Sequence, residues 1–343
     1  MEKKTVLIVG GYGVVGSQIA HMLHERYPQL EFLLGGRTAN KEAPFISERV
    51  KCVVTDNKST NPLEFIEEPI ALVINAVNDS LDNLLRVTQE QEIPLIDITR
   101  WTERMEHSIA WLENKELRAP IIFSSGWMGG TAALLSKLFA HNLQDVTVNI
   151  HALYSLQDKA GPNSIDYMNR LTTPFHIANR KVYPLSDPRK VTFANGHTAK
   201  CYRIDTPDHL TLLRFHTITE ANFRITFDHI LINWGLVALV KSRVWKMLSN
   251  KARQKLLYNP GEGGPHRLLI ELDGVNENGK KIGRTISVID PLGQTHLTAV
   301  GAVVQAKYLL ENDIQPRIYF SEDVGLSKST ILQIYDEYGV TIK

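Results

Sequence analysis

The sequence predicts an α/β protein in which an N-terminal doubly wound parallel sheet precedes an α+β domain with a mainly antiparallel sheet. Two observations support this division. Up to residue 130, short apolar strands alternate with amphipathic helices, which is typical of a parallel sheet with crossover helices. Beyond residue 131, β-like runs mostly follow one another directly, and Asn278-Gly279 separates two alternating strands as in a hairpin. With 343 residues, the chain is long enough for two domains.

The first strand leads directly into a glycine-rich turn. Thr5–Val9 is apolar and β-rich, Gly11-x-Gly13-x-x-Gly16 follows, and a helical run begins at once. This order is the dinucleotide fingerprint of a Rossmann fold. Glycines permit a tight turn close to a pyrophosphate, and the helix N-terminus presents N–H groups to it. We therefore expect contacts to a dinucleotide from Gly11, Tyr12, Gly13, Val14, Val15 and Gly16.

The second strand, over 31–34, indicates which dinucleotide binds. An NAD site usually places Asp or Glu about 20 residues after the glycines, where the carboxylate accepts from the ribose 2′-OH. Here Gly35 and Gly36 are followed by Arg37 and Thr38. No carboxylate repels a 2′-phosphate, and Arg37 can pair with one through its planar fork. The alternative is a solvated turn residue. The sequence favours NADP(H), bound at this end by Arg37 and Thr38.

The ends of later strands supply further candidates. Asp56 is the last residue of a third strand, predicted over 51–56. There it could accept from the adenine amino group or cap a helix beginning near Ser59. Asn75, Ala76 and Val77 end the fourth strand, where a cofactor would cross the sheet edge. The remaining elements of this sheet are predicted as strands over 94–99 and 120–125 and helices over 80–91 and 105–117.

The whole chain is predicted as three parts. Residues 1–130 form the NADP-binding Rossmann domain, 131–295 an α+β domain for substrate binding or dimerisation, and 296–343 C-terminal helices that return to the Rossmann domain. Within these parts we expect helices over 131–142, 298–310 and 327–338, and strands over 146–156, 191–193, 198–204, 210–216, 222–227, 266–274 and 283–289.

The run over 230–248 is apolar but contains Asn233, Lys241, Arg243 and Lys246. These polar residues argue against a membrane-spanning helix. We expect a packed domain or interface helix, with a membrane-surface helix as the alternative.

Composition excludes several classes of protein. Hydrophobic residues make up 43% and charged residues 22%, as in globular proteins. The formal net charge of +1 argues against a nucleic-acid binder or an anionic-membrane binder, because neither sign dominates. Cys52 and Cys201 lie far apart without metal-ligand spacing, so no metal site is predicted. The chain enters its first strand without a signal peptide, so we expect a cytoplasmic protein with reduced cysteines.

Several of these segments resemble the saccharopine dehydrogenase-like NADP-binding oxidoreductases. The likeness is specific over the first 130 residues and thin across the middle. It implies a nucleotide domain, an inserted sheet domain, NADP(H) and often a dimer. Members differ in substrate, including imines of amino acids and enoyl lipids. The segments that carry it are residues 10–16, Gly36-Arg37-Thr38, Val73-Ile74-Asn75-Ala76, residues 94–99 and residues 297–302.

Hydride transfer requires a proton donor near the nicotinamide. Arg100, after the fifth strand, could clamp a substrate carboxylate or form a surface ion pair at the start of a helix. His151 and Tyr154 begin the second domain and are candidate donors. Lying three apart, they are on opposite faces of a regular strand, so at most one faces the site. Further donor candidates are Tyr167, His176 and His216.

These residues predict an NADPH-dependent oxidoreductase that reduces a C=N or C=O bond of a small carboxylate-bearing metabolite. The alternatives are an enoyl reductase acting on a lipid-like substrate, with 230–248 lining its site, and a non-catalytic NADPH-sensing module. The expected partners are the small-molecule substrate and a second copy in a homodimer, with no nucleic acid and no membrane.

Overall fold

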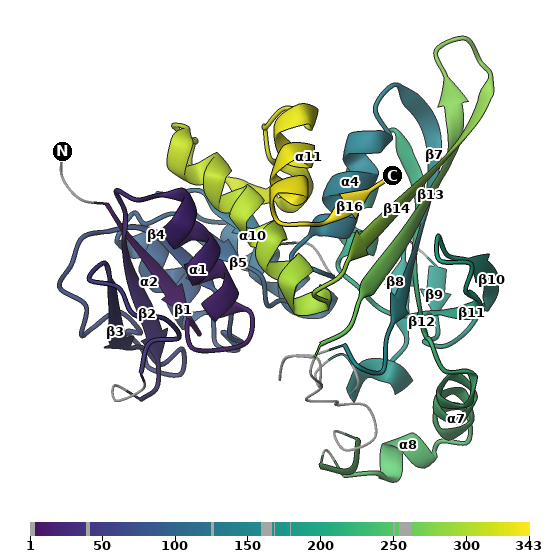
Figure 1. Cartoon of the computed structure of the whole chain (residues 1–343), viewed down its shortest axis with the longest axis horizontal. Helices are drawn as coiled ribbons and strands as arrows, with labels where there is room; N and C mark the ends of the chain where they lie inside the picture. The colour runs from purple at the N-terminus through teal and green to yellow at the C-terminus, as the bar shows by residue number, and fades with distance from the viewer. Residues whose placement is uncertain are drawn as a thin grey trace. The chain divides into compact units, whose positions relative to one another are not determined.

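The computed structural model describes residues 4–38, 42–124, 127–158, 167, 169–178, 180–249, 251–253 and 263–343. The chain divides into two compact units (Figure 1). Unit 1 comprises Met1–Gly130 and Thr298–Ser327, and unit 2 comprises Thr131–Leu297 and Lys328–Lys343. Each unit contains a large sheet of its own.

The sheet of unit 1 is parallel throughout its described strands, in the order β15-β6-β5-β4-β1-β2-β3. Residues of β1, β5 and β6 are all buried, as expected for strands covered on both faces. This confirms the predicted doubly wound sheet. The strands are β1 (Thr5–Val9), β2 (Glu31–Gly36), β3 (Val50–Val54), β4 (Ile70–Asn75), β5 (Leu95–Asp97), β6 (Ile121–Phe123) and β15 (Ile318–Phe320).

One strand and one helix of unit 1 differ from prediction. β15 adds an edge strand that the sequence does not reveal, because three residues are too few for a periodic pattern. No helix begins near Ser59 among the described residues, which form turns there. The helices are α1 (Gly16–Arg26), α2 (Asn83–Glu90), α3 (Thr102–Leu112), the 3₁₀ turn η3 (Ser321–Asp323) and α10 (Gln294–Glu311), whose first four residues belong to unit 2.

The main sheet of unit 2 is mostly antiparallel, in the order β10-β11-β12-β7-β13-β14-β16. Only β12 and β7 pair in parallel among its described strands. Gly279 has φ +74° in the turn between β13 and β14, which confirms the predicted hairpin. The strands are β7 (Leu143–Tyr154), β10 (Arg189–Thr192), β11 (Thr198–Arg203), β12 (Ile218–Phe227), β13 (His266–Asn276), β14 (Lys281–Asp290) and β16 (Thr341–Ile342), with β8 (Phe175–Ile177) and β9 (Arg180–Val182) in a separate ribbon.

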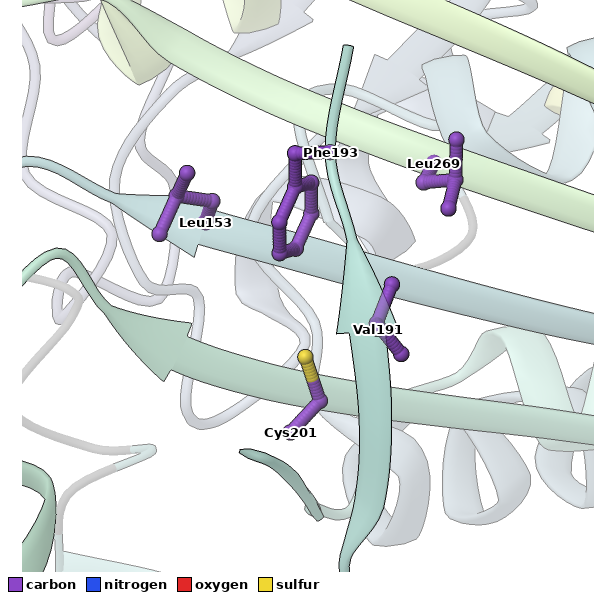
Figure 2. Packing of buried hydrophobic residues seen from close by; sticks show 5 residues of the cluster. All are labelled: Leu153, Val191, Phe193, Cys201 and Leu269. Atoms are coloured by element: carbon purple, nitrogen blue, oxygen red, sulfur yellow. The ribbon is translucent and has the colours of Figure 1, made fainter. Parts of the chain in front are cut away.

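A small apolar cluster closes one face of this sheet over β7, β11 and β13. Figure 2 shows its five side chains, which are all at least nine-tenths buried. The cluster fastens the segment around β10 onto the sheet and buries the Cys201 thiol, whose pKa burial raises to about 12. Its members are Leu153, Val191, Phe193, Cys201 and Leu269.

Two predictions for unit 2 are wrong. The strand expected over 210–216 is instead α6 (Asp208–Thr211) and η2 (Leu212–Arg214), because Pro207 with φ −57° and Asp208 in the first turn favour a helix start. The segment 296–343 does not return to unit 1 as a whole. Lys328–Lys343 belongs to unit 2, where β16 pairs with β14, since a two-residue strand gives no sequence signal.

The remaining helices of unit 2 are short or only partly packed. No helix in the described ranges is long and apolar enough to cross a membrane. They are α4 (Thr131–Phe139), η1 (Arg170–Thr172), α7 (Ile230–Lys241), α8 (Val244–Met247) and α11 (Lys328–Glu337).

Candidate functional site

The turn between β1 and α1 has no room for side chains at Gly10, Gly11 and Gly16 unless its neighbours move. Gly10 has φ +86°, and a Cβ at Gly16 would lie 2.2 Å from the carbonyl oxygen of Gly10. A Cβ at Gly11 would lie 2.9 Å from that of Leu34 on β2. The N–H groups of Gly10 and Gly11 donate to the carbonyl of Gly35 at 2.9 and 3.3 Å, which holds the turn against β2. The turn therefore requires glycine for steric reasons.

The helix α1 begins directly after this turn and has no side-chain cap. Its N-cap is Val15, and its first turn holds no acidic residue. The first N–H groups of a helix have no partner within it and carry partial positive charge, which favours a phosphate. The backbone geometry thus fits a pyrophosphate held by the predicted residues Gly11, Tyr12, Gly13, Val14, Val15 and Gly16.

The end of β2 is shaped by an aromatic ring. A Cβ at Gly36 would lie 2.4 Å from Cε2 of Tyr12, so this ring covers the backbone there. Burial, with a hydrogen bond to Cys52, raises the pKa of the Tyr12 hydroxyl. An acidic side chain cannot fit at Gly36 unless the ring moves. Arg37 and Thr38 follow, and both are exposed, so a ligand can reach them from solvent.

The carboxyl end of β4 lies beside the glycine turn. A Cβ at Gly10 would lie 2.7 Å from Cγ1 of Val77, and the N–H of Ala76 donates to the last residue of β1 at 2.9 Å. Asn75 is fully buried, and its Oδ1 accepts from Nδ2 of Asn57 at 3.2 Å. No described residue accepts from Nδ2 of Asn75. Buried donors normally have a partner, so this edge holds a donor available to a bound group.

Asp56 stabilises the turn after β3. Its Oδ1 accepts from the N–H of Lys58 at 3.0 Å, and its carbonyl accepts from the N–H of Ser59 at 2.9 Å. Of the two roles considered, a local cap is what these contacts provide, although the cap serves a turn and not a helix. Its contact to an adenine ring stays a prediction.

Arg100 lies in a buried cluster of carboxylates in unit 1. Its Nε donates to Oδ2 of Asp97 at 2.9 Å, its Nη1 contacts Asp82 and Ser108, and its Nη2 lies 3.8 Å from Oδ2 of Asp79. Only 3% of the side chain is exposed. Burial raises the pKa of Asp79 to about 6. The guanidinium is thus enclosed by groups of its own unit.

This enclosure argues against both predicted roles of Arg100, which are a clamp for a substrate carboxylate and a surface ion pair. A substrate carboxylate would have to compete with three carboxylates already around the guanidinium. A surface ion pair does not describe it either, because the pair is buried. Asp79 also accepts from the N–H groups of Asn83 and Leu85 at 3.0 and 3.1 Å, at the start of α2. The geometry favours a structural link between the segments that follow β4 and β5.

His151 lies on β7 among charged side chains of unit 2. It is fully buried, and its Nε2 lies 3.2 Å from Oε2 of Glu271, which Arg189 also contacts at 3.1 Å. Burial lowers the pKa of His151, so the neutral ring donates from Nε2, and this hydrogen bond holds the pKa of Glu271 below its ordinary value. No partner for Nδ1 exists among the described residues.

Two buried arginines lie beside His151 on the same face of the sheet. Nη2 of Arg203 and Nη2 of Arg224 each lie 2.7 Å from Oδ2 of Asp187. Nη1 of Arg224 also donates to Oδ1 of Asn149 at 3.1 Å. The two guanidinium groups hold the pKa of Asp187 below its ordinary value. Asp187 therefore fastens the segment before β10 to the sheet.

Tyr154 lies on the opposite face of β7, as strand alternation predicts. It is buried, which raises the pKa of its hydroxyl. Its ring meets that of His266 edge-on with centroids 4.7 Å apart. His266 is fully buried, its Nδ1 lies 3.0 Å from Oδ2 of Asp158, and no described residue hydrogen-bonds its Nε2.

No sequence motif marks the Asp158–His266 pair. A carboxylate that fixes Nδ1 of an imidazole leaves Nε2 to move a proton, as in general acid–base catalysis. The two residues are 108 positions apart, and strand pairing between β7 and β13 brings them together. Within the described ranges, no three His, Cys, Asp or Glu side chains are grouped as metal ligands.

Comparisons with known proteins show the fold. No family model and no curated protein matches the chain. Saccharopine dehydrogenase (L-Glu forming) from Saccharomyces cerevisiae matches with a TM-score of 0.65 at 11% identity, over 99% of each chain. Homospermidine synthase from Legionella pneumophila, solved with NAD, matches with a TM-score of 0.65 at 12% identity, over 100% of this chain and 91% of that one.

A third solved structure, a mutant meso-DAPDH from Clostridium tetani with DAP, matches with a TM-score of 0.50 at 11% identity, over 96% of this chain and 99% of that one. The chain thus has the saccharopine dehydrogenase-like fold that the sequence resemblance implies.

Proposed function

We propose that this chain, which shares the fold of saccharopine dehydrogenase, is an NADPH-dependent oxidoreductase that reduces a C=N or C=O bond of a small carboxylate-bearing metabolite. The observation that carries the proposal is the glycine turn. Gly11 and Gly16 have no space for a Cβ, and the helix that follows has no side-chain cap. These are the requirements of a pyrophosphate site.

The preference for NADP(H) over NAD rests on the end of β2. The fold itself does not decide, because the homospermidine synthase was solved with NAD. The Tyr12 ring occupies the space that an acidic side chain at Gly36 would need, and Arg37 is exposed one residue later. A guanidinium there would pair with a 2′-phosphate through two parallel hydrogen bonds.

The proposed proton donor comes from unit 2. Bound NADPH would supply the hydride, and the protein must supply a proton to the developing anion or amine. His151 and Tyr154 remain candidates. His266 joins them, because Asp158 fixes its tautomer and its Nε2 has no partner among the described residues.

The proposal of a carboxylate-bearing substrate is supported by the name of one protein with a similar structure. The saccharopine dehydrogenase is named for forming L-Glu, an amino acid with two carboxylates. Arg side chains are favoured wherever a protein binds a carboxylate through two hydrogen bonds. Arg100 is enclosed by carboxylates of its own unit, so we propose that other groups bind the substrate.

The test is NADPH consumption with mixtures of keto acids and amines, followed spectrophotometrically. We expect turnover that falls about 10²- to 10⁴-fold in His266→Gln and Asp158→Asn, the range for loss of a general acid. His141→Gln, at an exposed position after α4, is the matched control and should leave turnover unchanged. If NADPH binds but no imine, keto or enoyl compound is reduced, the protein is a sensor. Reduction of enoyl lipids alone would establish the enoyl reductase instead.

A further inference from the structure

The two helices α7 and α8 expose an unusually apolar surface. Ile230, Leu231, Trp234 and Met247 are each between 69% and 84% exposed. The first three lie on one face of α7, because residues four apart are neighbours on a helix. In Figure 1 these helices lie beyond the end of β12. We call this surface, with the exposed Val244, the α7–α8 surface.

The opposite side of these helices is firmly attached to unit 2. Asn233 accepts from the N–H of Phe227 at 2.9 Å and donates to its carbonyl at 2.8 Å, which fixes α7 to the end of β12. Leu236 and Trp245 are buried. The apolar side chains of the α7–α8 surface are therefore presented outward by a packed element. Large exposed apolar patches of this kind mark interaction sites.

The charges around this surface are mostly positive, and the exposed Asp228 just before α7 is the acidic residue beside them. Residues 229–253 contain five Lys or Arg and no Asp or Glu, whereas the whole chain has a net charge of only +1. The rest of the chain is therefore net negative. Lys241, Arg243 and Lys246 are exposed directly after the apolar face of α7. An apolar face bordered by basic residues is typical of helices that lie in the interface of an anionic membrane.

We propose that the α7–α8 surface docks on an anionic lipid bilayer, with its apolar side chains among the acyl chains and its basic residues at the headgroups. This is the membrane-surface alternative for 230–248. α7 has 12 residues and is about 18 Å long at ~1.5 Å per residue, too short for a hydrocarbon core of ~30 Å. It therefore lies on the bilayer and does not cross it.

A second copy of the chain fits this surface less well. In a two-fold symmetric dimer the same patch meets itself, so five positive charges and one negative charge, that of Asp228, would face the same set on the second copy, and repulsion would dominate. An anionic bilayer instead neutralises these charges. The proposal does not depend on the oxidoreductase activity, because lipid binding is measured without cofactor or substrate.

The experiment is co-sedimentation of the full chain with phosphatidylcholine vesicles that contain or lack phosphatidylserine. We expect binding at least about tenfold stronger with phosphatidylserine, weakened by salt. Two variants separate the contributions: an apolar variant, Ile230→Ser with Trp234→Ser and Met247→Ser, and a charge variant, Lys241→Gln with Arg243→Gln and Lys246→Gln. Each should lose binding about tenfold or more.

Matched controls lie elsewhere on the surface of unit 2. Leu292→Ser removes an exposed apolar side chain, and Lys280→Gln with Lys281→Gln removes exposed charges from the hairpin. Both should bind as the wild type does. The charge variant keeps the test valid if the apolar variant does not fold. Wild-type protein that stays in the supernatant with phosphatidylserine vesicles would overturn the proposal. So would a wild-type dimer that dissociates in the charge variant without any vesicle binding.

Discussion

The glycine turn after β1 and the buried charge clusters around Arg100 and His151 are two different kinds of structure. The turn is made of backbone, and its shape depends on the absence of side chains: a Cβ at Gly16 would lie 2.2 Å from a carbonyl oxygen. The clusters are made of side chains, and they depend on charge balance in a buried setting. Steric exclusion can be read from a short motif, whereas charge balance depends on residues far apart in sequence.

We expect the largest loss of stability from a substitution that removes the positive charge of Arg100. Arg100→Met would leave Asp79 and Asp97 buried without their cation, while Asp82 would keep its ion pair with Arg104, and we expect a loss of about 3–5 kcal/mol in the free energy of unfolding. Urea denaturation measures it. Arg86→Met is the matched control, since Arg86 pairs with Glu90 at the surface and should cost only about 0.5 kcal/mol.

The same variant decides between the roles of Arg100. If Arg100→Met keeps the wild-type denaturation midpoint and loses only turnover with carboxylate substrates, the substrate clamp would be correct and the structural role wrong.

A steric change should disrupt the glycine turn. In Gly16→Ala the new methyl must displace the carbonyl of Gly10, which costs roughly 1–3 kcal/mol and shifts the phosphate site. If that cost falls on the bound form, the affinity for NADPH should fall by about 5- to 150-fold, at about 1.4 kcal/mol per factor of ten. Gly235→Ala on α7, where a Cβ meets open space, should instead stabilise by about 0.5–1 kcal/mol. Equal NADPH affinity in Gly16→Ala and wild type would refute the steric account.

A pH titration tests the buried neutral imidazole. Burial lowers the pKa of His151 in the folded state, so below the ordinary pKa of about 6.5 the unfolded chain binds a proton that the folded chain does not. Stability contributed by this residue is complete above that pH and is lost as the pH falls, by at most about 1.4 kcal/mol per pH unit. His151→Gln should flatten this dependence. An unchanged slope would show that His151 is not responsible.

The motif-borne parts of the structure could be predicted from sequence. The glycine turn and the β13–β14 hairpin each depend on residues within about ten positions. The parallel strands of unit 1 follow from the alternation of strands and helices along the first 130 residues. β15 and β16 could not be predicted, because strands of three and two residues carry no period. The run over 210–216 has strand-like alternation, but Pro207 before it starts a helix.

The side-chain clusters could not be predicted from sequence, because their members are far apart in the chain. Glu271 is 120 positions from His151, and His266 is 108 from Asp158, so only the pairing of β7 with β13 makes them partners. For Arg100, the sequence suggested a functional contact where the structure shows a structural one. Its place after a strand suggested a ligand contact, but Asp79 and Asp82, about 20 positions earlier, already surround it.

The most direct test of the central claim is calorimetric titration of NADPH and NADH into wild-type protein and Arg37→Ala. A charged hydrogen-bonded pair with a 2′-phosphate contributes about 1.5–3 kcal/mol. We therefore expect wild-type protein to bind NADPH at least about tenfold more tightly than NADH. Arg37→Ala should remove that difference and leave NADH affinity unchanged. Equal affinity for the two cofactors in wild-type protein, with no change in Arg37→Ala, would contradict the account.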